Sequence, residues 1–158
     1  MVLILLRHAE RFSGADPDIT DRGKAQALHF CRWLQDRVEQ GQKVSLYASN
    51  KKRTQQTLAP IATALNLDIN VEEDLDELKA DENNSTFYAR TEQALNRCLE
   101  KDCDFLIACS HIDWLENAVL SLPSDLSAPE QMPLLSPCEL HEFHSQNGIW
   151  EHIRRQSF

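Results

Sequence analysis

Two arginines and two histidines each lie at or just beyond the end of an apolar stretch of this sequence. They are Arg7, His8, Arg53 and His111. Guanidinium groups match phosphate oxygens in a fork geometry and stay charged at any working pH. A neutral imidazole can attack phosphorus and form a phosphohistidine, while a second, protonated imidazole can neutralise the negative charge that develops. These residue types predict phosphoryl transfer by side chains alone, without a metal or another cofactor.

The apolar stretches that precede these residues have the composition of strands in a sheet. Residues 2–6 and 105–109 are continuously apolar, as expected of strands that are buried on both faces. Further strands are predicted at 44–49 and 69–71. Because open α/β sheets bind ligands at the carboxyl ends of their strands, we expect the arginines and histidines to converge there.

Amphipathic stretches alternate with these strands and predict four helices. The helices cover 20–41, 51–67, 86–100 and 113–122. This alternation predicts an α/β fold, a three-layer αβα sandwich around a mainly parallel sheet. The segments 138–143 and 149–154 predict an antiparallel hairpin that turns near Asn147-Gly148, after a loop at 121–137.

The composition is that of a soluble globular chain, and no linker or repeat interrupts it, so residues 1–158 are predicted to form one domain. The net charge of -9 repels phosphate backbones and anionic lipid, so neither nucleic acid nor membrane is an expected partner. The apolar run at 2–6 is too short for a signal peptide or a membrane span, which predicts a cytoplasmic location. Five cysteines form no CxxC pair, and His141 and His144 would point to opposite faces of a strand, so no metal site is predicted.

Four segments of the sequence, in order, resemble the signatures of one enzyme family. LRHAE at 6–10 resembles an RHG signature, ITDRGKAQA at 19–27 an LTxxGxxQA segment, SNKKRTQQT at 49–57 an SPxxRxxQT segment, and CSH at 109–111 the strand end that carries a second histidine. The family is the histidine phosphatase superfamily, also called phosphoglycerate-mutase-like. The short length and the closing hairpin are similar to its small SixA-type phosphohistidine phosphatases.

The resemblance implies roles for the matched residues. His8 would take the phosphoryl group, and Arg7, Arg53 and His111 would form the phosphate pocket around it. Three further residues would bind the substrate or lie at the rim of the pocket: Thr20, Gly23 and Ser110. The partner would be a phosphorylated small molecule or a protein that carries phosphohistidine.

Three places in the sequence differ from the family pattern. Ala9 stands in place of a glycine, Asn50-Lys51-Lys52 in place of a proline-containing run, and Ile112 in place of a small residue. A bulkier wall at Ile112 is expected to narrow the site. The four pocket residues are intact, so these differences bear on the choice of substrate more than on the chemistry.

Hydrolysis of an ester also requires a proton donor for the leaving oxygen. Glu77 is the first candidate, because it follows the short predicted strand at 69–71 and matches the family's glutamate position. Asp113 is an alternative, although residues 113–116 also have the pattern of a capping box with Asp113 as the helix N-cap. Glu10 is a third candidate, and its other expected role is to orient Arg7.

Three interpretations of function stay open from the sequence. The first is a metal-independent phosphatase that works through a phosphohistidine on His8 and acts on phosphohistidine in a partner protein. The second is a small-molecule phosphomonoesterase or mutase on the same fold. The third belongs to another class: a catalytically degenerate module that binds phosphorylated partners without turning them over.

Overall fold

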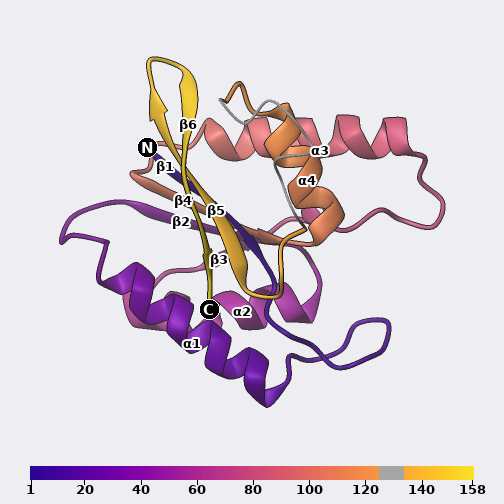
Figure 1. The fold of residues 1–158 in the computed structure, drawn as a ribbon, viewed down its shortest axis with the longest axis horizontal. Helices are drawn as coiled ribbons and strands as arrows, with labels where there is room; N and C mark the ends of the chain where they lie inside the picture. Colours follow the sequence, from indigo (N-terminus) through magenta and orange to yellow (C-terminus); the bar gives the residue numbers. More distant parts are fainter. Residues whose placement is uncertain (125–133) are drawn as a thin grey trace.

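A six-stranded sheet lies at the centre of the computed structural model of this chain, which describes residues 1–124 and 134–158 (Figure 1). The strand order is β3-β2-β4-β1-β5-β6. The strands are β1 (Val2–Arg7), β2 (Val44–Ala48), β3 (Ile69–Val71), β4 (Phe105–Ser110), β5 (Glu139–Gln146) and β6 (Ile149–Ser157). The pairs from β3 to β1 are parallel, whereas β5 and β6 continue the sheet antiparallel beyond β1. The predicted α/β class, with a mainly parallel sheet and a C-terminal hairpin, is confirmed.

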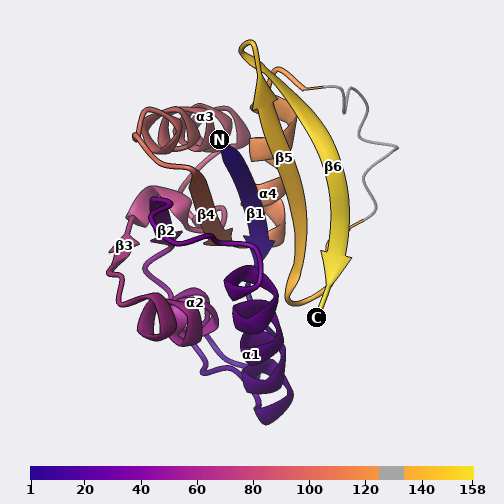
Figure 2. The same ribbon diagram turned by 90° about the vertical axis from the view of Figure 1, so that its left-hand side faces the viewer.

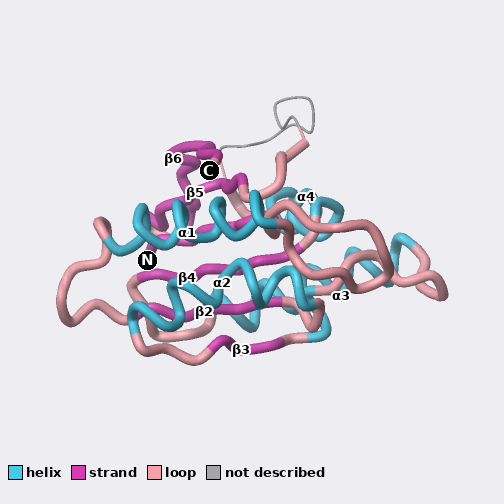
Figure 3. Tube along the Cα trace, turned by 90° about the horizontal axis from the view of Figure 1, so that it is seen from below, coloured by secondary structure: helices cyan, strands magenta, loops and turns pink. Residues whose placement is uncertain are grey.

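Four helices cover the two faces of this sheet. They are α1 (Asp21–Gln35), α2 (Lys52–Leu65), α3 (Asn84–Leu99) and α4 (Ile112–Ser121). Helices α1 and α2 lie on one face, and α3 and α4 lie on the opposite face (Figure 2, Figure 3). A short 3-10 helix, η1 (Glu73–Leu75), follows β3 and leads toward α3. The result is the predicted arrangement of three layers.

Alternate side chains of the strands contribute to two separate cores. In β1, Leu3 and Leu5 pack with Trp114 on the side of α3 and α4. Ile4 and Leu6 point the other way and pack against side chains of α1 and α2. Since successive strand residues face opposite sides of a sheet, a strand covered on both faces must be apolar throughout. This explains the continuous apolar run at the start of the sequence.

Helix α1 is shorter than the sequence predicted, because it ends at Gln35 and not near Gly41. Two residues after this end, the guanidinium of Arg37 lies 2.5 Å from the fully buried Glu142 carboxylate of β5 and over the ring of Trp33. A buried carboxylate needs a cationic partner, so this contact favours the observed path of the chain after α1. Gly41 lies in a later turn with a φ of 92°.

The starts of two helices also differ from the prediction. Helix α4 begins one residue earlier than expected, at Ile112, and its N-cap is His111. The prediction that Asp113 is the N-cap is therefore wrong. Helix α3 begins two residues earlier than expected, because the Asn83 side chain accepts a hydrogen bond from the backbone N–H of Thr86 at 3.0 Å.

The C-terminal hairpin turns where the sequence predicted. Asn147 and Gly148 have φ values of 53° and 80°, the left-handed conformations that an Asn-Gly turn requires. The loop predicted at 121–137 lies partly outside the described residues. None of the helices in the described part of the chain combines the length and apolar character that crossing a membrane would need.

Candidate active site

The two histidines meet at the carboxyl ends of β1 and β4. Arg7 and Ser110 end these strands and pair with each other across the parallel ladder. His8 and His111 come next, and their ring centroids are 5.4 Å apart with an interplanar angle of 57°. The backbone N–H of His8 donates to the carbonyl of Ser110 at 3.1 Å, which fixes the two strand ends to each other.

The ring of His8 has a defined tautomer. Its Nδ1 lies 2.8 Å from the carbonyl oxygen of Ala9, and a carbonyl can only accept, so Nδ1 carries the proton. Nε2 then holds the lone pair. Burial is the main cause that lowers the pKa of His8 to about 4, and the nearby guanidinium groups of Arg53 and Arg7 contribute to this lowering. His8 is therefore neutral near pH 7, which is the form that attacks phosphorus.

Arg53 is a buried cation in the first turn of α2, with 1% of its surface exposed. Its Nη2 lies 2.8 Å from Glu77 Oε2 and 3.1 Å from His111 Nδ1. Its Nε and Nη1 atoms have no hydrogen-bond partner among the described residues. A cation at a helix N-terminus opposes the helix dipole unless an anion is bound, and buried donors need acceptors. The Glu77 carboxylate supplies one anion, and the donors without a hydrogen-bond partner favour a further anion at this position.

Arg7 is a second guanidinium with donors left over. Its Nη1 donates to the carbonyl of Leu135, which anchors the side chain, and its Nε has no hydrogen-bond partner in the described part of the chain. Burial lowers the pKa of Arg7, but a guanidinium stays charged in proteins. The ends of two different elements thus bring unpaired N–H donors to the surroundings of His8.

His111 differs from the protonated imidazole that the sequence analysis expected. Its Nδ1 faces Arg53 Nη2 at 3.1 Å and must accept, because a guanidinium can only donate. Its Nε2 then carries the proton and donates to Ser49 Oγ at 2.9 Å. Burial lowers the pKa of His111 to about 2, with a further contribution from Arg53. His111 is therefore neutral in this arrangement, and the positive charge of the site comes from the arginines.

Of the three carboxylates considered as proton donors, Glu77 is the one in contact with the pocket. Its Oε2 lies 2.8 Å from Arg53 Nη2 and 3.7 Å from His111 Nδ1, and its side chain is 42% exposed. Asp113 instead accepts from the backbone N–H of Leu78 at 2.8 Å. It therefore holds the segment that carries Glu77.

Glu10, the third candidate, faces helix α1. It accepts from the hydroxyl of Thr20 at 2.8 Å and lies 3.5 Å from Arg22. The expectation that Glu10 orients Arg7 is not supported by these contacts. Its partners tie the loop after His8 to the start of α1.

A family model described as "Histidine phosphatase superfamily (branch 1)" matches residues 3–86 of the sequence, just over half of the chain. The chain belongs to the histidine phosphatase superfamily. No curated protein sequence matches it.

Solved structures of other proteins show the same fold over nearly the full length. A mutant phosphoserine phosphatase from Entamoeba histolytica, in complex with phosphoserine, has a TM-score of 0.75 at 16% identity, covering 98% of this chain and 95% of that one. A mycobacterial glucosyl-3-phosphoglycerate phosphatase has a TM-score of 0.75 at 13% identity, covering 99% and 98%. The protein histidine phosphatase SixA, complexed with tungstate, has a TM-score of 0.70 at 17% identity, covering 99% and 97%. The predicted phosphoglycerate-mutase-like fold is thus confirmed.

In this member of the histidine phosphatase superfamily, Thr20 and Gly23 lie against the loop that follows His8. Thr20 is the N-cap of α1, and its hydroxyl oxygen accepts from the backbone N–H of Gly23 at 3.0 Å. A Cβ atom at Gly23 would lie 2.1 Å from the carbonyl oxygen of Glu10. The absence of a side chain at Gly23 therefore allows α1 to approach the loop.

Ser110 was expected to bind the substrate, and the structure gives it different partners. It is fully buried, and its hydroxyl donates to the carbonyl of Leu75 at 2.5 Å. This bond connects β4 to η1, two residues before Glu77. Ser110 therefore contributes to the position of Glu77 and His8 through the backbone.

The run Asn50-Lys51-Lys52, which differs from the family pattern, is held by two carboxylates, Asp76 and Asp16. Asp76 is buried, accepts from the Asn50 N–H at 3.2 Å and lies 3.5 Å from Lys51 Nζ. Asp16 accepts from the Lys52 N–H at 3.0 Å, and it also lies 3.8 Å from Arg53 Nη1. Their side chains come from distant polar segments, so nothing in the local sequence pointed to them.

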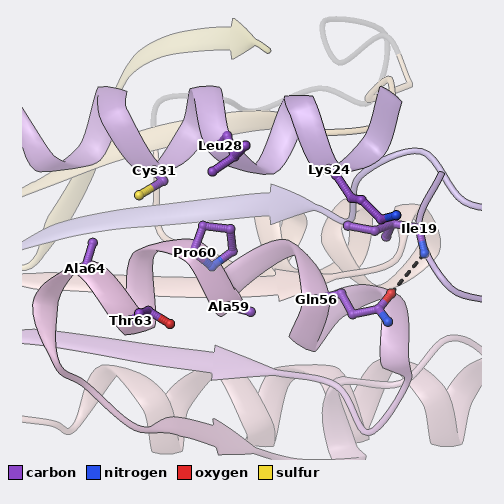
Figure 4. A pocket seen from close by; sticks show the side chains of 9 residues that line it. All are labelled: Ile19, Lys24, Leu28, Cys31, Gln56, Ala59, Pro60, Thr63 and Ala64. Carbon is purple, nitrogen blue, oxygen red and sulfur yellow. Dashed lines mark hydrogen bonds between the residues drawn. The ribbon is translucent and has the colours of Figure 1, made fainter. Parts of the chain in front are cut away.

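An apolar groove of about 650 Å³ lies away from these residues, between α1 and α2. Figure 4 shows Leu28 and Cys31 of α1 facing Pro60 of α2 across it, with Gln56 accepting a hydrogen bond from the Ile19 N–H at one end. The four pocket residues do not line this groove. Its lining is mainly apolar, together with the polar side chains of Lys24, Gln56 and Thr63.

Proposed function

We propose that this chain is a metal-independent phosphatase that takes the phosphoryl group of its substrate onto His8 Nε2. One observation carries the proposal: a neutral His8 lies among two guanidinium groups that keep unpaired N–H donors. A phosphoryl group bound there would satisfy those donors and lie against the nucleophile. Catalysis of phosphoryl transfer depends mainly on such positioning and charge stabilisation.

In the first step, His8 Nε2 attacks phosphorus, and a P–N bond forms as the bond to the leaving oxygen breaks. Arg7 and Arg53 bind the phosphoryl oxygens. Arg53 Nη2 moves from Glu77 to the phosphate, so that Glu77 can hold a proton and pass it to the leaving oxygen. The Nδ1–H of His8 stays on the Ala9 carbonyl, and the phosphorylated ring carries a positive charge.

In the second step, water attacks phosphorus and the P–N bond breaks. Glu77, now a carboxylate, accepts the proton that the water loses. The electron pair of the broken bond returns to Nε2. Inorganic phosphate is released and His8 is neutral again, so protons and charges balance over the cycle.

As substrate we propose phosphohistidine in a partner protein. The fold likeness to SixA supports this choice. The ion pair between Glu77 and Arg53 supports it as well, because this contact engages the carboxylate that would protonate a leaving oxygen. An imidazole leaving group is a far weaker base than an alkoxide and depends less on such an acid.

A phosphorylated small molecule is the second candidate, and a cleft beside Glu77 favours it. The cleft has a volume of about 410 Å³ and is lined in part by Lys51 and Lys79, together with Glu73 and Asp76. It would hold a small polar leaving group next to the proposed acid. The phosphoserine complex of the Entamoeba histolytica protein shows that this fold accommodates such a ligand.

The substitution His8→Ala tests the reaction. Wild type should hydrolyse p-nitrophenyl phosphate in the presence of EDTA, whereas His8→Ala should fall to background, because no other lone pair replaces Nε2. The matched control is His29→Ala, which removes an exposed histidine of α1 and should keep full activity. Wild type stopped during turnover should carry acid-labile phosphate on His8.

Three outcomes separate the candidate functions. Faster turnover of a phosphohistidine peptide than of phosphoserine supports the protein substrate, and the reverse order supports the small molecule. Binding of phosphate by wild type with no turnover of any probe would establish a degenerate binding module. Activity that survives His8→Ala, or that EDTA removes, would contradict the proposed mechanism.

A further inference from the structure

We infer that Thr57 is a positioning residue of the phosphoryl transfer: its hydroxyl sets the place of the His8 segment relative to Arg53. Thr57 lies in α2, one turn after Arg53, and it is fully buried. The inference rests on the proposed function, because it assigns Thr57 a part in that reaction. The experiment below is chosen so that the two can fail separately.

The Thr57 hydroxyl makes one hydrogen bond to each side of the pocket. Its Oγ1 accepts from the backbone N–H of Ala9 at 2.9 Å and donates to the carbonyl of Arg53 at 2.6 Å. Ala9 directly follows the nucleophile, and Arg53 is the buried guanidinium of the pocket. One oxygen atom therefore joins the backbone of both segments.

A hydroxyl suits this position better than any apolar group of the same size. A threonine hydroxyl has one donor and two acceptor sites, and here the donor serves Arg53 and an acceptor serves Ala9. Ala9 is fully buried, so its N–H would lose its acceptor if the hydroxyl were removed. A buried donor without an acceptor is unfavourable, and the loop would shift to find one.

The other bonds to the His8 segment lead to different elements. His8 N–H donates to Ser110 at the end of β4, and the Glu10 N–H donates to Gln26 of α1 at 2.9 Å. Neither bond fixes the segment to α2. Since His8 Nε2 and the Arg53 guanidinium must reach the same phosphoryl group, their separation has to be held, and Thr57 holds it.

The test compares Thr57→Val, which keeps the shape and loses the hydroxyl, with Thr57→Ser, which keeps the hydroxyl. The matched control is Thr91→Val in α3, because Thr91 is fully buried and its hydroxyl has no hydrogen-bond partner in the described part of the chain. Each variant is assayed for turnover of p-nitrophenyl phosphate, for inhibition by inorganic phosphate and for its melting temperature.

We expect Thr57→Val to lower kcat/KM roughly 10- to 100-fold, the size of effect that a displacement of about 1 Å has on aligned reacting groups. It should also raise the inhibition constant of inorganic phosphate. Thr57→Ser should keep most of the activity, and Thr91→Val should match wild type. A merely structural role would lower the melting temperature and leave kcat of the folded enzyme unchanged.

Two results would overturn the inference: a folded Thr57→Val with wild-type kcat/KM, or a Thr57→Ser as impaired as Thr57→Val. If Thr57→Val does not fold, Thr57→Cys takes its place, because a thiol is a weaker acceptor, and the expected order of activity is Thr, Ser, Cys. Equal activities of Thr57→Ser and Thr57→Cys would then contradict the positioning role of Thr57. If wild type turned over no phosphate probe, the proposed function would be contradicted. The positioning role of Thr57 would still be tested by comparing how tightly wild type and the Thr57 variants bind inorganic phosphate.

Discussion

At the scale of single residues, the two histidines of the pocket differ in what their ring nitrogens can do. His8 uses Nδ1 to donate to Ala9, and the described residues form no hydrogen bond to its Nε2. His111 has both nitrogens engaged, with Ser49 and with Arg53. A nucleophile needs an available lone pair, so the geometry favours His8 for attack and His111 for holding Arg53 in place.

Glu77 is the residue whose substitution tests proton transfer. Glu77→Gln should lower kcat for an alkyl phosphate roughly 100- to 1,000-fold, within the range of general acid catalysis. The loss should be smaller for p-nitrophenyl phosphate, because nitrophenolate leaves without a proton. Steady-state rates with the two substrates measure the difference.

Asp113→Asn and Glu10→Gln serve as controls for this experiment. Both carboxylates hold neighbouring groups: Asp113 accepts from the Leu78 N–H, and Glu10 contacts Thr20 and Arg22. We expect them to change kcat much less than Glu77→Gln. An Asp113→Asn variant as slow as Glu77→Gln on the alkyl ester would move the acid to Asp113.

At the scale of elements, three successive backbone N–H groups of the loop after β1 are each bound by a different element. Strand β4 bonds to the His8 N–H, α2 bonds to the Ala9 N–H, and α1 bonds to the Glu10 N–H. Strand β4 lies within the sheet, and α1 and α2 pack against the same face of it. His8, the proposed nucleophile, is thus positioned by packed secondary structure, which is more precise than a free loop.

Gly23 is where α1 comes closest to that loop. Gly23→Ala would place a Cβ atom 2.1 Å from the Glu10 carbonyl, and backbone cannot yield as a flexible side chain can. We expect a loss of roughly 1–3 kcal/mol in the free energy of unfolding, as for other overpacked sites. Activity should fall as well, because the displaced loop carries His8.

Urea unfolding and turnover of p-nitrophenyl phosphate measure both effects. Lys24→Ala, an exposed substitution at the next position of the same helix, is the control and should change neither by much. A Gly23→Ala variant with wild-type stability would mean that α1 can withdraw from the loop without cost.

At the scale of the whole molecule, burial of titratable groups couples stability to pH. Burial is the main cause that lowers the pKa of His8 to about 4, of His111 to about 2 and of His141 to about 4. In the unfolded chain these groups titrate near 6.5. Between pH 6.5 and 5 the unfolded state therefore binds more protons than the folded state.

The free energy of unfolding should accordingly fall as the pH is lowered through this range. Each of the three histidines contributes at most about 1.4 kcal/mol per pH unit. Urea unfolding at several pH values measures the slope. His8→Asn should make the slope shallower, and His29→Ala, which removes an exposed histidine, should leave it unchanged. A stability that does not vary over this range would contradict the burial of neutral histidines.

The sequence by itself determined the layers of the fold and predicted that four candidate site residues lie close together. Continuous apolar runs are required of strands covered on both faces, and the residues after such runs must collect at one edge of a parallel sheet. For this reason Arg7, His8, Arg53 and His111 could be placed together before any contact was known. The family resemblance added Glu77 by its position.

Contacts between distant segments were decided only by the tertiary structure. The protonation of His111 follows from the guanidinium against its Nδ1 and from burial, neither of which is visible in a local pattern. Just beyond the end of α1, Arg37 reaches a buried carboxylate on β5, a contact between segments far apart in the sequence. Thr57 was part of a matched motif, but its role depended on which backbone N–H lay opposite its hydroxyl. Local sequence sets the propensity of an element, whereas a hydrogen bond across the chain exists only once packing has brought its two atoms together.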